Sequence, residues 1–322
     1  MNKNDMALKK TALYVGISLL IFSLLFYTLF AVLNFIISPL VYALLSAKLG
    51  YVVTEVLTGI IYTAVFIIPA LIFRKISHNQ SAEHKIAPKF PLDLAPFIIM
   101  ATVAISISCA YVNSWLGIMF GVSDAAAPTT EVSSLLDFLL LVFTTALVPA
   151  ICEEFLFRKT IEHALLPYGE GFAIISSAVL FGLMHQNAWQ IFYATMAGIL
   201  LGYVYAKTRS YLCVFLIHLV NNFISSIQTA ISANTKEPYA SIAISMLVVI
   251  VLILGVTSAI ILVLKEKNKK DIYETGSFGK LFGPSSSFIK SKTASPSKTF
   301  FLSPTVLIFI ILSVLVCAYQ FL

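Results

Sequence analysis

Long stretches without charge dominate this sequence and limit what it can fold into. A helix that crosses a bilayer needs about 20 consecutive apolar residues. Apolar residues make up 59% of the chain and charged residues 11%, whereas a soluble domain has roughly 25% charged residues. These proportions exclude a soluble enzyme, a disordered chain and a coiled coil. Nine stretches of spanning length and low charge lie at residues 12–37, 51–73, 96–120, 134–157, 171–187, 189–206, 211–231, 241–264 and 303–322.

The sequence therefore predicts an all-α polytopic membrane protein with about eight to nine transmembrane helices. Lysine and arginine indicate the orientation, because cytoplasmic loops carry an excess of both. If the N-terminus is cytoplasmic, 19 of the 21 basic residues fall on the cytoplasmic side, and only Lys48 and Lys236 fall opposite. We expect a multi-pass protein of the cell membrane with a cytoplasmic N-terminus and an extracytoplasmic C-terminus. The basic residues of the cytoplasmic loops account for the net charge of +6. We therefore expect the lipid bilayer as a partner, and no nucleic acid.

Two adjacent carboxylates and an arginine occur at the end of the expected span 134–157. Glu154 and Arg158 are four residues apart, so they share a helix face and can pair. Glu153 points about 100° away on the helix and need not use that arginine. The pattern indicates one carboxylate neutralised by Arg158 and another available for proton transfer. The alternative is that both are interfacial glutamates beside basic residues at a helix end.

Two further polar groups lie in later spans. His185 follows Phe181 by four residues at the end of the span 171–187, where a solvated or packing histidine is the simpler interpretation. His218 and Asn222 are four residues apart in the span 211–231 and share a face. Buried there, both need hydrogen-bond partners. Interhelical polar contacts are the alternative for this pair, and are the interpretation for Asn221.

The three patterns E-E-x-x-x-R, F-x-x-x-H and H-x-x-x-N, in this order and each in a hydrophobic segment, resemble the CPBP family. These are the CAAX prenyl-protease and bacteriocin-processing intramembrane proteases, also called Abi proteins. The resemblance covers roughly residues 130–232. It implies an endopeptidase that works inside the membrane around a polar cavity. It further implies the site residues: Glu153 and His185 to activate water, His218 and Asn222 to hold the oxyanion, and Glu154 with Arg158 to support the site.

The residues leave the cofactor open. Two histidines and a carboxylate could bind Zn²⁺ with an open position for water, with Glu153, His185 and His218 as candidate ligands. The family is often described as metalloproteases. A metal-free mechanism based on glutamate uses the same residues, and their spacing does not decide between the two.

We expect five regions along the chain. They are N-terminal transmembrane helices at 1–130, a catalytic core at 131–232, an additional transmembrane helix at 233–264, a flexible cytoplasmic loop at 265–302 and a C-terminal transmembrane helix at 303–322. The loop is rich in Ser, Lys and Gly, as flexible linkers are.

The expected depths of His185 and Glu153 in the membrane differ, which raises the question of how the two side chains meet. His185 lies 14 residues beyond Gly171, which at 1.5 Å per residue places it roughly 21 Å from that end of the helix. Glu153 is expected near the cytoplasmic end of its own span. The two can meet if the fifth helix is strongly tilted, if residues 159–170 dip into the membrane, or if the turn near His185 stays buried.

The leading function is an intramembrane endopeptidase that acts on membrane-associated peptides or proteins, either CAAX-type tails or peptide precursors. A non-catalytic membrane scaffold or bacteriocin-immunity factor is the alternative, although it would not need all four polar residues. A proton-coupled transporter is a third possibility. It would predict broken helices in paired halves, and the sequence has no such symmetry.

Overall fold

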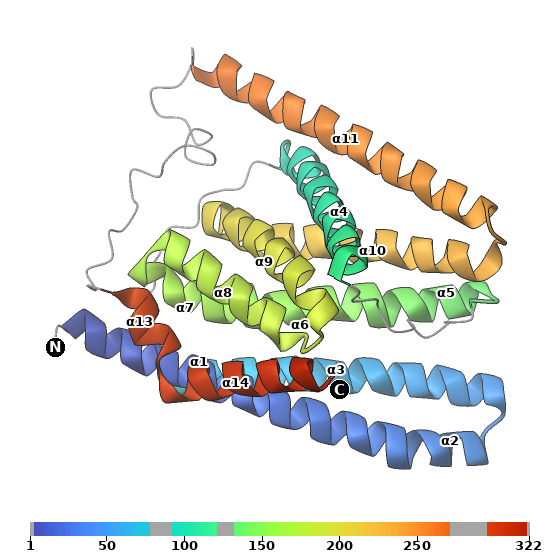
Figure 1. Ribbon diagram of the computed structural model, residues 1–322, viewed down its shortest axis with the longest axis horizontal. Coiled ribbons are helices and arrows are strands. Elements are labelled where there is room, and N and C mark those ends of the chain that lie inside the picture. Colours follow the sequence, from blue (N-terminus) through green and yellow to red (C-terminus); the bar gives the residue numbers. More distant parts are fainter. Residues whose placement is uncertain (1–2, 78–91, 121–131, 271–294, 321–322) are drawn as a thin grey trace.

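The computed structural model describes residues 3–77, 92–120, 132–270 and 295–320, and every regular element within these ranges is a helix (Figure 1). The helices are α1 (Lys3–Val32), α2 (Ser38–Leu44), α3 (Ala47–Ile76), α4 (Ala95–Phe120), α5 (Leu135–Val142), α6 (Val148–Leu156), α7 (His163–Leu165), α8 (Glu170–Met184), α9 (Ala188–Thr208), α10 (Tyr211–Asn234), α11 (Tyr239–Lys270), α13 (Pro296–Phe301) and α14 (Pro304–Tyr319). Three π-helical segments, η1 (Leu33–Ile37), η2 (Phe143–Leu147) and η3 (Phe157–Glu162), and the 3₁₀ turn η4 (Leu166–Tyr168) join some of them.

Six helical segments in the described residues are long and apolar enough to cross a membrane. They are Asn4–Leu44, Ala47–Ile76, Ala95–Met119, Leu135–Tyr168, Tyr211–Asn234 and Tyr239–Lys265. Two apolar helices, α8 and α14, are shorter. The predicted all-α, multi-pass membrane protein is confirmed, while the count of eight to nine spans stays a prediction.

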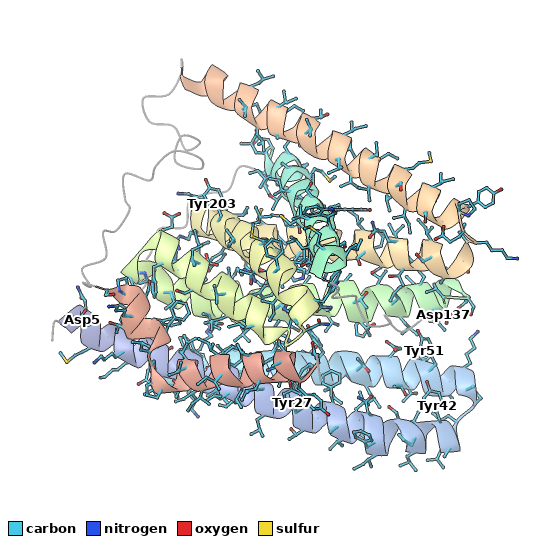
Figure 2. All side chains as sticks on the ribbon, in the orientation of Figure 1. Asp5, Tyr27, Tyr42, Tyr51, Asp137 and Tyr203 are labelled. Carbon is cyan, nitrogen blue, oxygen red and sulfur yellow. The ribbon has the colours of Figure 1, made fainter. Side chains whose placement is uncertain are left out.

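Large apolar side chains cover the outer faces of the bundle, as expected for helices in contact with lipid. Phe35 and Ile118 are 82% and 81% exposed. Figure 2 shows Asp5 and Tyr203 toward the end that holds the N-terminus, Tyr51 and Asp137 toward the other end, and Tyr27 between them.

The fourth span is longer than the charge pattern predicts. We expected it to end at residue 157, but α5, η2, α6, η3, α7 and η4 form one segment from Leu135 to Tyr168. Arg158 looked like the start of a loop because a charge usually marks the end of a span. In the structure its side chain is fully buried and paired inside the protein, so the helix continues and Glu153 lies near its middle.

The loop 185–187, which joins α8 to α9 inside the bundle, brings His185 to the depth of Glu153. Gly169, with φ 130°, reverses the chain between η4 and α8, a conformation that suits glycine. Glu153 and His185 lie equally far along the chain from Gly169, on the two arms of this reversal. Helices α8 and α9 pack closely as a hairpin whose tip, the loop 185–187, is inside the bundle (Figure 1). Gln186 in this tip is 7% exposed. Two features therefore allow His185 and Glu153 to meet. The turn near His185 is buried, and the helix that carries Glu153 continues over residues 159–168.

Candidate active site

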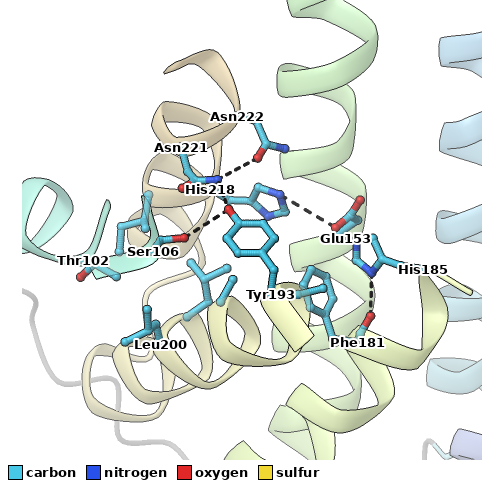
Figure 3. A pocket seen from close by; sticks show the side chains of 14 residues that line it. Thr102, Ser106, Glu153, Phe181, His185, Tyr193, Leu200, His218, Asn221 and Asn222 are labelled. Carbon is cyan, nitrogen blue, oxygen red and sulfur yellow. Dashed lines mark hydrogen bonds and ion pairs between the residues drawn. The ribbon is translucent and has the colours of Figure 1, made fainter. Parts of the chain in front are cut away.

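A cavity of about 90 Å³ lies between α4, α6, α8, α9 and α10 (Figure 3). Glu153, His185, His218 and Asn222, the four residues that the sequence singled out, all line it. Tyr193 also lines it, from α9. Figure 3 shows the side chains of Glu153, His185 and His218 around the same space. Three segments that are separate in the sequence thus meet at one polar cavity, which is large enough to hold a few water molecules.

Glu153 is 4% exposed and is held from two sides. The hydroxyl of Tyr62, on α3, donates a hydrogen bond to its Oε1. Its Oε2 lies 3.9 Å from Nε2 of His218. The sequence did not single out Tyr62, because one tyrosine within an apolar run gives no signal of its own. Its contact fixes a carboxylate that faces the cavity.

Glu154 and Arg158 form a buried ion pair behind the cavity. Arg158 Nη1 lies 3.2 Å from Glu154 Oε1, and both side chains are fully buried. The same Glu154 oxygen lies 2.7 Å from Nδ1 of His218. Arg158 Nη2 donates to the carbonyl of Gly198 at 3.2 Å, and the guanidinium lies 4.5 Å from the centroid of the Phe181 ring. The carboxylate, the carbonyl and the ring compensate the buried charge, as such a charge requires.

The tautomer of His185 follows from its partner. Nδ1 lies 2.9 Å from the carbonyl oxygen of Phe181, one turn earlier. A carbonyl oxygen can only accept, so Nδ1 carries the hydrogen and Nε2 of the neutral ring keeps its lone pair. The backbone N–H of His185 bonds to Gly182 instead of Phe181. The tightened last turn of α8 therefore frees the Phe181 carbonyl for the ring.

A proline sets the position of Asn222. Pro149 has no N–H, so the carbonyl of Thr145 lacks its normal helical donor. Asn222 Nδ2 donates to this carbonyl at 3.1 Å, and Asn221 Nδ2 donates to Asn222 Oδ1 at 3.1 Å. An amide nitrogen has two hydrogens, so one remains available to the cavity. The π-helical segment η2 just before Pro149 is typical of functional sites.

Asn221 joins two of the helices around the cavity. It donates to the hydroxyl of Tyr193 at 2.9 Å, and that hydroxyl lies 3.4 Å from Oγ of Ser106 on α4. Asn221 thus links α10 to α9, as interhelical polar contacts do, while it also borders the cavity. The sequence offered no signal for Tyr193 or Ser106, which lie in segments without a recognisable pattern.

The geometry does not form a metal site. In the described part of the chain, no three His, Cys, Asp or Glu side chains lie close enough together to hold a metal ion. Nδ1 of His218 bonds to Glu154 and Nδ1 of His185 to a backbone carbonyl, so only Nε2 of each ring could be a metal donor. A zinc site with three protein ligands needs convergent donors. We therefore derive no step through a metal.

Carboxylates, imidazoles and an amide around one cavity are groups that a membrane-embedded hydrolase can use. Residues 135–224, from the start of α5 to the middle of α10, match a family model described as Type II CAAX prenyl endopeptidase Rce1-like. This match covers 90 of the 322 residues and supports the resemblance to the CPBP family that the three sequence patterns show. The matched residues contain Glu153, His185, His218 and Asn222. No curated protein and no solved structure matches the chain.

Proposed function

We propose that this protein is an intramembrane endopeptidase in which a water activated by Glu153 and His185 cleaves a peptide bond. The substrate is a membrane-associated peptide or protein, with a CAAX-type tail or a peptide precursor as the two classes that the family suggests. One observation carries this proposal: Glu153 and His185, from separate helices, border one buried cavity together with His218 and Asn222.

Water activation is divided between two groups. Glu153 is the general base, since a carboxylate with little competition from solvent can take a proton from a bound water. His185 Nε2, which keeps its lone pair, accepts the second hydrogen of the same water and orients it toward the scissile carbonyl. The hydroxide attacks the carbonyl carbon and forms a tetrahedral oxyanion. Glu153 then returns its proton to the leaving amine, and the peptide bond breaks.

Two donors on α10 face the oxyanion. Asn222 supplies the second hydrogen of Nδ2, and His218 supplies a hydrogen on Nε2. In His218, Nδ1–H donates to Glu154, and Nε2 faces Glu153. A proton on Nε2 is therefore stabilised by carboxylates on both sides of the ring. Donors placed in a water-poor cavity before the reaction stabilise developing negative charge strongly.

Cleavage of defined peptides tests the proposal. The full chain in lipid nanodiscs is incubated with a fluorescent peptide that ends in a prenylated CAAX sequence, with its non-prenylated form, and with a peptide precursor. We expect cleavage of at least one membrane-bound peptide by the wild type and none by Glu153→Gln, which keeps the shape but cannot take the proton. Gln190→Ala, an exposed glutamine near the start of α9, is the control. A scaffold or transporter would cleave none of them.

We further propose that the N-terminus is cytoplasmic and the C-terminus extracytoplasmic. The distribution of 19 basic residues against two supports it. Topology reporters fused after residues 80, 128, 236 and 280 should read inside, outside, outside and inside. Reversed readings at 80 and 128 would overturn this orientation.

A further inference from the structure

The loop that carries His185 has irregular backbone inside the helical bundle. It joins α8 to α9 over residues 185–187, and Gln186 has φ 48°, in the left-handed region that non-glycine residues rarely adopt. Within a membrane, non-helical backbone is tolerated only where protein groups satisfy its N–H and C=O groups. A strained residue also persists only where its surroundings hold it. The question is which residues hold this loop.

Gln320, just beyond the end of α14, bonds to the loop backbone with both ends of its amide. Its Nε2 donates to the carbonyl of Gln186 at 2.8 Å. Its Oε1 accepts from the N–H of Ala188 at 3.2 Å. One side chain therefore satisfies a carbonyl and an N–H on the two sides of Asn187. From α1, the hydroxyl of Tyr27 donates to Oε1 of Gln186.

The docking of α14 places Gln320 at this point. Val306, Phe309, Ser313 and Cys317 are buried, and their spacing of three or four residues puts them on one face. The helix packs on α1 and also touches α8. Oγ1 of Thr305 donates to the carbonyl of Leu13 at 3.2 Å, which fixes the start of α14 against α1. Its other end then lies at the loop 185–187 (Figure 1).

We propose that Gln320 is a positioning residue of the active site: it holds the loop 185–187 and thereby the imidazole of His185 against the cavity. The C-terminal helix, outside the matched residues 135–224, then completes the support of the site. This inference rests on the proposed function, in which His185 orients the attacking water. Small misplacements of a catalytic group can cost roughly 10²-fold in rate, so a loosened loop should slow the chemical step.

The test compares Gln320→Ala and Gln320→Glu with wild type and with Gln190→Ala, a nearby glutamine with an exposed side chain. We expect Gln320→Ala to lower kcat by roughly tenfold or more with KM nearly unchanged, since His185 acts on water and not on substrate binding. Gln320→Glu keeps the acceptor for Ala188 N–H and loses the donor, so its loss should be smaller. Amide hydrogen exchange should rise over 185–189 in Gln320→Ala and stay unchanged elsewhere.

Three results would overturn the proposal. The first is a kcat for Gln320→Ala equal to that of Gln190→Ala. The second is unchanged exchange over 185–189. The third is exchange that rises equally through the whole chain, since that reports a general loss of stability. The exchange measurement needs no activity, so it tests the support of the loop even if the wild type cleaves no peptide, a result that would contradict the proposed function alone.

Discussion

The two sides of the cavity are stabilised in different ways. On the α6 side, Glu154 and Arg158 are fully buried and joined to His218 and to the Gly198 carbonyl. All four lie within residues 135–224. On the loop side, the imidazole of His185 has one hydrogen bond to its own helix. The loop after it is held by Tyr27 of α1 and by Gln320 beyond α14.

The two sides of the cavity therefore differ in how far the sequence predicts them. The α6 side is a charge network, and its residue types and helical spacing are visible in the sequence. The loop side depends on contacts between segments that are far apart along the chain and carry no pattern. We expect changes on the α6 side to affect folding and activity together, and changes on the loop side to affect mainly activity.

Removal of Arg158 should have the largest effect on the α6 side. Arg158→Ala leaves Glu154 buried without its cation, and breaking a buried pair costs roughly 3–5 kcal/mol. We expect a sharp fall in folded yield and in thermal stability, measured on detergent-purified protein. Lys159→Ala is the matched control: it removes the neighbouring charge from an exposed side chain and should change little.

The double variant Arg158→Ala with Glu154→Gln sharpens this result. It removes the uncompensated charge, so part of the folded yield should return. If the double variant folds no better than the single one, the ion pair does not contribute as the structure indicates.

Removal of the proposed oxyanion donors should have the next largest effect. Asn222→Ala should lower kcat by about 10²–10³-fold, the usual loss for one such donor, while folded yield stays near wild type. His218→Ala should lose a similar factor in rate and also some stability, because Glu154 loses a partner. Asn221→Ala, which touches Asn222 without a proposed role in the reaction, should lose much less. Equal losses for the two asparagines would contradict the assignment.

Part of this organisation was accessible from sequence. Apolar runs predicted the helical membrane class, and the spacing of Glu153, His185, His218 and Asn222 identified residues that line one cavity. The end of the fourth span was wrong because charge alone does not show that Arg158 is paired and buried. Tyr62, Tyr193 and Gln320 were missed for another reason. Their importance comes only from tertiary contacts, and tyrosine or glutamine in an apolar helix is otherwise ordinary.

Loss of the Tyr62 hydroxyl should have a moderate effect. Tyr62→Phe removes the donor to Glu153 Oε1, and a hydrogen bond to a charged group contributes about 1.5–3 kcal/mol. We expect kcat to fall by roughly tenfold or more with folded yield maintained. Tyr211→Phe is the control, since that hydroxyl donates to the carbonyl of Ile151 and does not contact Glu153. Similar rates for the two variants would remove Tyr62 from the support of the site.

A metal chelator should have the smallest effect. Because the described residues form no metal site, cleavage by the wild type should persist after treatment with a chelator. Metal content should be the same in wild type, His185→Ala, His218→Ala and Asn222→Ala. If the two histidine variants lose zinc and all activity while Asn222→Ala keeps the zinc, the two sides of the cavity are joined by a metal, and the water activation proposed here is wrong.

The most direct test of the central claim is a double-mutant cycle between the two sides of the cavity. Cleavage rates are measured for wild type, Glu153→Gln, His185→Ala and the double variant under single-turnover conditions. If Glu153 and His185 activate one water as a unit, each single change should abolish most of the catalysis, and the double variant should be about as slow as the slower single one, because groups that act as a unit are strongly non-additive. Wild-type rates in both single variants, or independent losses that multiply in the double variant, would contradict the account.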